Sequence, residues 1–280
     1  MIIALFTNLS KSHSKPIAIG IKEYLVSRNV EVVADDKEAS HIGAKPLSSV
    51  DPKKIDYIIS LGGDGTILWT FHAHPTLEAP IVGINLGSLG FMADITIEEI
   101  YPALENLLSG QFQIQNRIMM EGETLKHEKC FAINEISVHR ARNPSLIDLA
   151  IYVDGNYLNT FSADGIIVAT PNGSTAYSLA AGGPILSPEL DALVITPISP
   201  HTISNRPIVL MPKHEIQVRY LGEHAAVEVT YDGCGHFTLH PGEIFRISSS
   251  QRKFRLVNMY HYDYFATLRS KLGWSGKLKK

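Results

Sequence analysis

The sequence predicts a chain of two parts, an α/β domain with a parallel, Rossmann-like sheet followed by a β-rich domain. Over roughly the first 110 residues, apolar runs alternate with helix-like segments, which is typical of parallel sheets joined by crossover helices. After Gly110 the chain changes to short β-rich pieces separated by turn residues. Its 280 residues, 45% of them hydrophobic, are enough to build a core in each part.

Four apolar runs of the first part are predicted strands. Ile17, Ile21 and Leu25 recur at helical spacing and indicate the first helix. Thr96 is a candidate N-cap for the last helix, whose first turn is acidic. In chain order we expect strand 2–6, helix 15–28, strands 30–33 and 57–61, a helix ending near 74–75, strand 81–85, a second glycine turn at Gly87-Ser88-Leu89-Gly90 and a helix running to Gly110.

The second part is predicted to be mostly β, with one clear helical piece that begins near Ser174 and ends at Gly182. We expect domains at 1–112 and 113–258, and an amphipathic tail, 259–280, that packs on the first domain. The expected strands of the second part are 132–139, 146–153, 157–161, 165–170, 208–211, 215–220, 227–231, 245–247 and 255–258.

Composition and charge argue against several classes of protein. The net charge is −3 and no basic stripe stands out, so neither nucleic acid nor an anionic membrane is an expected partner. No run approaches the ~20 apolar residues of a membrane span, and the first residues are typical of a strand rather than a signal peptide. Cys130 and Cys234 lie far apart and suit a reducing compartment better than a disulfide or zinc framework. We therefore expect a cytoplasmic protein.

The most informative local feature is Gly62-Gly63-Asp64-Gly65-Thr66, between an apolar run and a helix-like segment. A glycine turn after a parallel strand lets a phosphate approach the backbone and the amino end of the next helix. An aspartate there would repel the phosphate, so Asp64 is better explained as a base or as an indirect partner of Mg²⁺. The turn therefore predicts phosphoryl transfer, with a purely structural turn as the alternative. Neither the lysine P-loop nor the G-x-G-x-x-G pattern is present.

Segment 170–184 is a second candidate site because hydroxyls, glycines and prolines gather directly after a predicted strand. Ser174 and Thr175 can cap a helix or donate to a polar ligand, and Tyr177 can face a ribose or base. The alternative is a capped helix on a β scaffold. Segment 232–236 is predicted to be a hairpin turn, and Cys234 within it has no basic partner that would make it a nucleophile.

Asn134 and Glu135 form a third candidate site, because both are poor strand formers inside a run that otherwise predicts a strand. A carboxylate at this position could bind the vicinal hydroxyls of a ribose. The alternative is a polar residue on an edge strand.

Taken together, these motifs resemble the NAD kinase family, the enzymes that make NADP. The short glycine motif is shared with diacylglycerol, sphingosine and 6-phosphofructo-kinases, whereas segment 170–184 is long and more specific. The resemblance covers essentially the whole chain. The similar parts are Gly62–Thr66, Asn134-Glu135, Asp164-Gly165, segment 170–184 and Lys271-Leu272-Gly273-Trp274-Ser275.

The resemblance implies that ATP is the donor and that Asp64 takes the proton from the 2′-hydroxyl of the adenosine ribose of NAD. No dense acidic cluster is visible, so Mg²⁺ is expected to arrive with the triphosphate. The family also implies a homo-oligomer, a tetramer, in which a neighbouring subunit's second domain helps complete each NAD site. The implied phosphate turn is Gly62, Gly63, Gly65 and Thr66, and the implied NAD-binding residues are Asp64, Gly65, Phe91, Asn134, Glu135, Ser162, Asp164, Thr175, Ala176, Tyr177, Ser178, Leu179 and Ala180.

Two positions depart from the family pattern. Many members carry Arg or Lys two positions before the Asp164-Gly165 step, where this chain has Ser162, and many carry Gln where it has Cys234. Neither departure touches Asp64. A lipid kinase of the diacylglycerol type is the alternative enzyme, since it would share the glycine motif without needing segment 170–184. A non-catalytic NAD(P) sensor is the alternative outside catalysis, although it would need no base in the turn.

Overall fold

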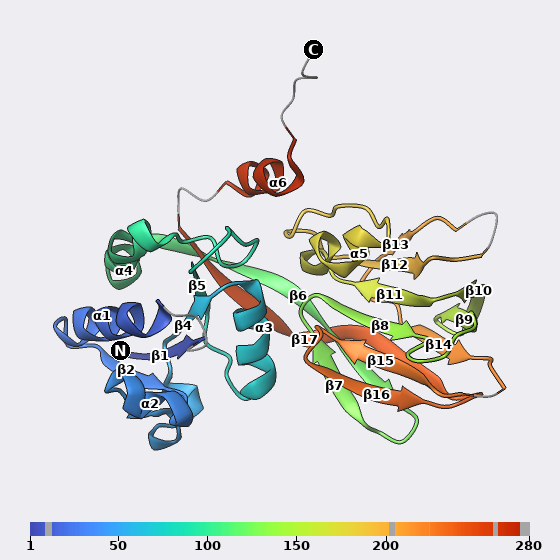
Figure 1. Cartoon of the computed structure of the whole chain (residues 1–280), viewed down its shortest axis with the longest axis horizontal. Helices are drawn as coiled ribbons and strands as arrows, with labels where there is room; N and C mark the ends of the chain where they lie inside the picture. The colour runs from blue at the N-terminus through green and yellow to red at the C-terminus, as the bar shows by residue number, and fades with distance from the viewer. Residues whose placement is uncertain (9–12, 202–204, 224, 260–262, 275–280) are drawn as a thin grey trace, which may run out of the picture. The chain divides into compact units, whose positions relative to one another are not determined.

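The computed structural model describes residues 1–8, 13–201, 205–223, 225–259 and 263–274 (Figure 1). The chain divides into two compact units. Unit 1 comprises Met1–Gln115 and Arg255–Lys280, and unit 2 comprises Asn116–Phe254. Two long strands, β6 (Phe112–Thr124) and β17 (Ile244–Met259), each have residues in both units.

Unit 1 is built on a parallel sheet with the strand order β17-β5-β4-β1-β2-β3. Side chains of α1, α2 and α4 pack with Leu5, Leu61 and Ile84 on one face. The helix α3 packs on the other face of the sheet, where a Cβ built on Gly83 would lie 2.9 Å from Ile67 Cδ1 of that helix. Because helices cover both faces, the strands are apolar without alternation. The elements are β1 (Ile2–Thr7), α1 (Ser14–Val26), β2 (Glu31–Ala34), α2 (Asp36–Ile42), β3 (Lys45–Pro46), β4 (Tyr57–Gly62), α3 (Asp64–Ala73), β5 (Ile81–Asn85), α4 (Ile100–Ser109) and α6 (Tyr264–Leu272), with 3₁₀ turns at Leu47–Ser49, Pro52–Lys54 and Ile97–Glu99.

The strand order of unit 1 reverses at β1, because β2 lies on one side of β1 and β4 on the other. Open α/β sheets bind ligands at such a switch point, outside the carboxyl ends of the strands. The predicted glycine turn lies at this point, since β4 ends at Gly62 and α3 begins at Asp64.

The last helix of the α/β part follows the predicted signals closely. The Thr96 N–H donates to Glu99 Oε2 at 3.1 Å, which is half of a capping box, and a 3₁₀ turn leads into α4. The helix ends at Gly110, whose φ of 76° is the left-handed conformation that favours glycine at a C-cap. The predicted end at Gly110 is confirmed, whereas Thr96 caps the 3₁₀ turn that precedes α4 rather than α4 itself.

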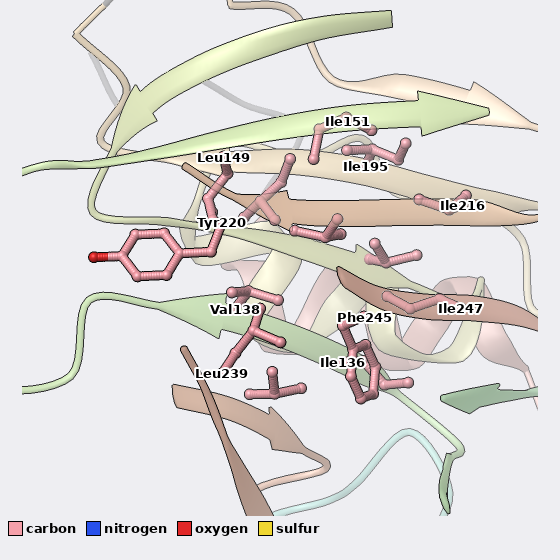
Figure 2. Close-up of a cluster of buried hydrophobic side chains, with 14 of the residues drawn as sticks. Ile136, Val138, Leu149, Ile151, Ile195, Ile216, Tyr220, Leu239, Phe245 and Ile247 are labelled. Carbon is pink, nitrogen blue, oxygen red and sulfur yellow. The ribbon is translucent and has the colours of Figure 1, made fainter. Parts of the chain in front are cut away.

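Unit 2 is made of antiparallel strands in two groups, one with the order β13-β12-β11-β8-β15-β16 and one containing β10-β9-β14-β17, with β6 pairing to β7 and β17. Figure 2 shows side chains of both groups meeting in one core, among them Val138 of β8, Leu149 of β9 and Phe245 of β17. The predicted fold class, an α/β part and a β-rich part, is therefore confirmed. The remaining elements are β7 (Lys129–Ala132), β8 (Glu135–His139), β9 (Ile147–Val153), β10 (Asn156–Ala163), β11 (Gly165–Ala169), α5 (Tyr177–Ala180), β12 (Leu193–Ile198), β13 (Ile208–Leu210), β14 (Ile216–Tyr220), β15 (Val227–Tyr231) and β16 (Gly235–Leu239), with a 3₁₀ turn at Asn172–Thr175.

Four predicted elements differ from the structure. Segment 132–139 is not one strand, because the N–H groups of Ile133 and Asn134 donate to a side chain, Asp232, instead of to a neighbouring strand. Segments 245–247 and 255–258 belong to the single strand β17, whose polar middle hides its continuity. The helical piece expected from Ser174 is a 3₁₀ turn followed by one turn of α5.

The sequence analysis also missed α2, β3, β6, β7, β12 and β16. The polar stretch that forms α2 has little apolar periodicity, and its start is fixed by the Asp35 carboxylate, which accepts the Lys37 N–H at 2.9 Å. Among the described residues, no helix is long and apolar enough to cross a membrane. Of the expected tail, residues 260–262 and 275–280 lie outside the described residues, including the last residue of the Lys271–Ser275 motif.

Candidate active site

The glycine turn of unit 1 forms the amino end of α3. Gly63 is the N-cap with extended backbone, and Asp64 is the first helical residue. A Cβ at Gly63 or Gly65 would meet no atom within 4 Å, so both glycines face open space. A Cβ at Gly62 would lie 2.1 Å from Thr66 Oγ1, so the close approach of strand and helix requires glycine there. Open glycines beside the first N–H groups of a helix suit the binding of a phosphate.

The carboxylate of Asp64 is held by three consecutive backbone amides of the second glycine turn. Its Oδ2 accepts the Phe91 N–H at 2.8 Å, and its Oδ1 accepts the N–H groups of Met92 at 3.0 Å and Ala93 at 2.9 Å. Gly90 makes this approach possible, since a Cβ there would lie 2.1 Å from Asp64 Oδ1. The half-buried carboxylate is therefore fixed in one orientation before any ligand binds.

Asn85 at the end of β5 holds the loop that carries these amides. Its side-chain amide donates to the Ser88 carbonyl at 2.5 Å and to the Ala93 carbonyl at 3.2 Å, and its Oδ1 accepts the Gly87 N–H at 2.6 Å. These bonds close the loop between 85 and 93 on itself. The buried Asn85 therefore has a role that the sequence analysis did not assign.

In unit 2, Asp232 organises the segment that contains Asn134 and Glu135. Its carboxylate accepts the N–H groups of Ile133 and Asn134 at 2.8 Å and of Glu135 at 3.1 Å. Positive φ angles at Asp232 and Gly233, 49° and 64°, fit the tight turn between β15 and β16. The predicted hairpin is confirmed, and its first residue also anchors the predicted ribose-binding pair.

Segment 170–184 packs directly on this pair. Asn172 donates to Asn134 Oδ1 at 2.5 Å, and the buried Arg117 donates to Asn172 Oδ1. The Thr170 N–H donates to the Asn134 carbonyl at 2.8 Å, and a Cβ at Gly173 would lie 2.2 Å from that same oxygen. Two motifs that lie about 40 residues apart in the sequence thus form one polar cluster.

Glu135 is the chemically unusual member of this cluster. Burial, reinforced by the negative charge of Asp232, raises its pKa to about 8, and a hydrogen bond from the Tyr177 backbone opposes the increase. Its Oε2 is buried without a hydrogen-bond partner among the described residues. A protonated carboxyl both donates and accepts, so Glu135 can bind a hydroxyl in either sense. Because β8 lies between β11 and β15, the edge-strand alternative for Glu135 is wrong.

The predicted stretch from Thr175 to Ala180 contains both exposed and buried side chains. Tyr177 is 43% exposed, whereas Ser178 is fully buried and its hydroxyl lies 3.0 Å from Thr196 Oγ1. Thr175 donates to the Asn172 carbonyl at 3.2 Å, which ties the stretch to the polar cluster. Ala176, Leu179 and Ala180 lie on the same short turn, and their side chains are half-buried or exposed.

Asp164 and Ser162 lie away from this cluster, at the other end of β11. The five residues of that strand separate Asp164 from segment 170–184 by about 20 Å. Arg140 donates from Nε to Asp164 Oδ1 at 2.8 Å, and Ser162 donates to the Asp148 carboxylate. A cation therefore stands beside Asp164 although position 162 carries no charge.

The structure brings the predicted residues together as one group in unit 1 and one in unit 2. Asp64, Phe91 and the glycine turn form the first, and Asn134, Glu135 and Thr175–Ala180 form the second. Burial and the charge of Asp232 raise the pKa of the Cys234 thiol to about 11, so it stays protonated at neutral pH. No group of three or more His, Cys, Asp and Glu side chains that could hold a metal ion is found in the part of the chain that the structure describes.

Three residues at the centre of these contacts, Gly90, Asn172 and Asp232, stood in motifs that the sequence analysis had noted without giving them a role. Arg117 and Asn85 were missed altogether. The signal for Asn85 was available, because a polar residue ends a buried strand and a glycine turn follows. Arg117 gave no local signal, since its partner lies 55 residues further along the chain.

Family models match both parts of the chain. The ATP-NAD kinase N-terminal domain matches residues 3–112, and the ATP-NAD kinase C-terminal domain matches residues 133–259. The NAD kinase of Protochlamydia amoebophila is 61% identical over 277 residues, which cover 99% of this chain and 99% of that protein. The NAD kinase of Moorella thermoacetica is 38% identical over 98% of this chain and 90% of its own length.

Two solved structures share the fold at full length. Yeast NADH kinase in complex with NADH superimposes with a TM-score of 0.88 at 26% identity, over 100% of this chain and 89% of the other. The NAD kinase of Archaeoglobus fulgidus in complex with ATP gives 0.77 at 27% identity, over 98% and 99%. The chain therefore belongs to the ATP-NAD kinase family, enzymes that phosphorylate NAD with ATP.

Proposed function

We propose that this chain transfers the terminal phosphoryl group of ATP to the 2′-hydroxyl of the adenosine ribose of NAD. The ribose oxygen bonds to the γ-phosphorus, the bond to the β,γ-bridging oxygen breaks, and the ribose proton passes to Asp64. The products are NADP and ADP. The observation that carries this assignment is the Asp64 carboxylate, held by three backbone amides in a glycine turn at the switch point of the sheet.

Asp64 is positioned to act as a general base. A ribose hydroxyl is a weak nucleophile, and a well-placed base typically contributes ~10²–10⁴-fold to the rate. A carboxylate has about four lone-pair sites, and the three amide bonds of Asp64 occupy most of them while fixing its direction. The site that remains is the one we assign to the ribose hydroxyl.

The open side of the turn at Gly63 and Gly65, with Gly62 and Thr66 behind it, is assigned to the phosphates of ATP. Mg²⁺ bound to the triphosphate would neutralise charge as it develops during transfer. The amides leave Asp64 only the acceptor site assigned to the ribose hydroxyl, and the described residues offer no acidic cluster, so the triphosphate oxygens are the expected ligands of the metal.

The polar cluster of unit 2 is assigned to NAD. Glu135, with a buried oxygen that lacks a partner, and Asn134 beside it are assigned to the ribose hydroxyls. Phe91 is assigned to packing on the dinucleotide. The stretch from Thr175 to Ala180, together with Ser162 and Asp164, is assigned to binding the remaining parts of NAD. The solved complexes of the yeast enzyme with NADH and of the Archaeoglobus enzyme with ATP support this choice of ligands.

Turnover tests the assignment. The purified chain, incubated with NAD, ATP and Mg²⁺, should form NADP, and Asp64→Asn should lower kcat by ~10²-fold or more with nearly unchanged NAD affinity. Glu78→Gln, which changes an exposed carboxylate outside both groups of assigned residues, serves as a purification control. Phosphorylation of diacylglycerol without formation of NADP would favour the lipid kinase, and binding of NAD without any turnover would favour a sensor.

We further propose a homotetramer, located in the cytoplasm, in which a second subunit helps to complete each NAD site. The separation of Asp164 from Glu135 by the length of β11 supports this, because the two need not serve the same copy of NAD. Inactive Asp64→Asn and Asp164→Ala chains, refolded together, should regain activity in mixed oligomers. Mixed oligomers, confirmed by mass, that stay as inactive as their parents would place each site within one chain.

A further inference from the structure

The helix α6, red in Figure 1, belongs to unit 1, and its first residue contacts the loop that holds Asp64. The ring centroid of Tyr264, the first residue of α6, lies 6.1 Å from that of Phe91, with the rings tilted by 49°. Asp263 caps the helix by accepting the Ala266 N–H at 3.0 Å. The cap and the ring contact give Tyr264 a defined place against the loop.

The buried face of α6 is the one that carries Tyr264. Thr267 and Leu268, three and four residues further along, are 3% and 5% exposed, and this spacing puts them on the same face as Tyr264. Phe265 on the neighbouring face is 63% exposed, and Trp274 beyond the helix is 53% exposed. The contact with Phe91 therefore belongs to the packed side of the helix.

The loop between 85 and 93 is pinned from two sides. On the side of β5 it lies so close that a Cβ at Gly83 would be 2.4 Å from the Met92 carbonyl oxygen. On the side of α6, the half-buried Phe91 ring meets Tyr264. Because the Phe91 N–H donates to Asp64 Oδ2 at 2.8 Å, whatever fixes the backbone at 91 also fixes this carboxylate oxygen.

We propose that Tyr264 is a positioning residue: its ring holds Phe91, and through the Phe91 amide it orients the Asp64 carboxylate. This inference rests on the proposed role of Asp64 as the base. Tyr264 itself takes no part in proton transfer. The helix α6 would thus support the Asp64 carboxylate, whose direct hydrogen-bond donors lie within residues 91–93.

Three variants of the full-length chain separate this role from general packing. Tyr264→Ala removes the ring, Tyr264→Phe keeps it without the hydroxyl, and Trp274→Ala removes a neighbouring exposed aromatic ring as the matched control. The loss of one aromatic pair predicts that Tyr264→Ala lowers kcat ~3–10-fold. Tyr264→Phe and Trp274→Ala should stay within about 2-fold of the original chain.

Two measurements make the assignment specific to Asp64. Hydrogen exchange at the Phe91 amide should accelerate in Tyr264→Ala and not in Tyr264→Phe. In an Asp64→Asn background, Tyr264→Ala should cost no further kcat, because the residue through which it acts is already lost. Circular dichroism at the assay temperature checks the fold, and Tyr264→Leu replaces the alanine variant if that chain is unfolded.

Unchanged kcat and unchanged Phe91 exchange in folded Tyr264→Ala would overturn the inference, and so would a full additional loss in the Asp64→Asn background. Failure of the proposed function looks different. In that case the unmodified chain forms no NADP, or Asp64→Asn keeps its turnover, while hydrogen exchange still reports whether Tyr264 restrains the loop.

Discussion

Replacing Glu135 by glutamine should make the protein more stable at alkaline pH and leave its acid stability nearly unchanged. Glutamine keeps the size and shape of the side chain and cannot ionise. The original side chain is half-buried on β8 with its Oε2 fully buried, and burial together with the charge of Asp232 raises its pKa from an ordinary 4.5 to about 8. The substitution therefore removes a group that the folded protein holds in its neutral form.

The sign and size of the effect follow from proton linkage. Below pH 4.5 Glu135 is neutral in both the folded and the unfolded chain and contributes no difference. Between pH 4.5 and about 8 the unfolded chain releases a proton that the folded chain keeps, so the free energy of unfolding falls by up to ~1.4 kcal/mol per pH unit. The whole interval sets an upper bound of about 5 kcal/mol, and we expect about 2–4 because water can reach a newly charged carboxylate. Above pH 8 the difference is constant.

Urea unfolding of Glu135→Gln and of the original chain, at matched protein concentration from pH 4 to 9, measures this difference. Both tryptophans, Trp69 and Trp274, belong to unit 1, so their fluorescence follows unit 1 while circular dichroism follows the β-rich unit as well. Glu78→Gln removes an exposed carboxylate and is the matched control. A stability difference that stays flat from pH 5 to 9 would refute the buried, neutral state of Glu135.

Three further substitutions test the two groups of residues. Gly90→Ala should lower kcat by ~10-fold or more, because its Cβ would lie 2.1 Å from Asp64 Oδ1 and displace the carboxylate; kinetics equal to those of the original chain would contradict this. Gly65→Ala should raise helix stability by up to ~1 kcal/mol yet raise the KM for ATP, because its Cβ would occupy the open side of the turn; thermal unfolding and kinetics measure the two effects. Asp232→Asn should cost ~1–3 kcal/mol of stability in urea unfolding and raise the KM for NAD, since three amides lose a charged acceptor, and unchanged values of both would remove its anchoring role.

Local pattern was sufficient for much of the fold. The strands β1, β4 and β5 are apolar runs, and the Thr96 and Gly110 caps of α4 and its preceding turn are short-range features, so periodicity and capping rules found them. The same rules placed Asp64 in a turn between strand and helix. They failed for α2, where polar residues form the helix, and for β17, where one strand spans 16 residues with a polar middle.

The candidate site was predictable only where its contacts are local. The amides that donate to Asp64 lie 27 to 29 residues away from it in the sequence. Two of the amides that donate to Asp232, those of Ile133 and Asn134, lie 99 and 98 residues away. Local sequence patterns do not extend over such distances. Gly90 and Asp232 could therefore be recognised as turn residues, but the distant segments that they contact could not be predicted. The family resemblance supplied roles for residues such as Phe91, whose amide contact with Asp64 was not part of that resemblance.

Asp64 and Asp232 show why an aspartate in a turn is ambiguous in sequence. Each carboxylate accepts three consecutive backbone N–H groups of a distant segment, so by hydrogen bonding alone both are anchors. Their surroundings differ. Asp232 is 8% exposed, and its charge helps to keep Glu135 neutral, whereas Asp64 is half-buried between two glycines that face open space. The accessibility of the carboxylate to a ligand therefore distinguishes Asp64, the proposed base, from Asp232, which anchors a backbone segment. That accessibility depends on the absence of side chains at Gly63 and Gly65 rather than on the aspartate itself.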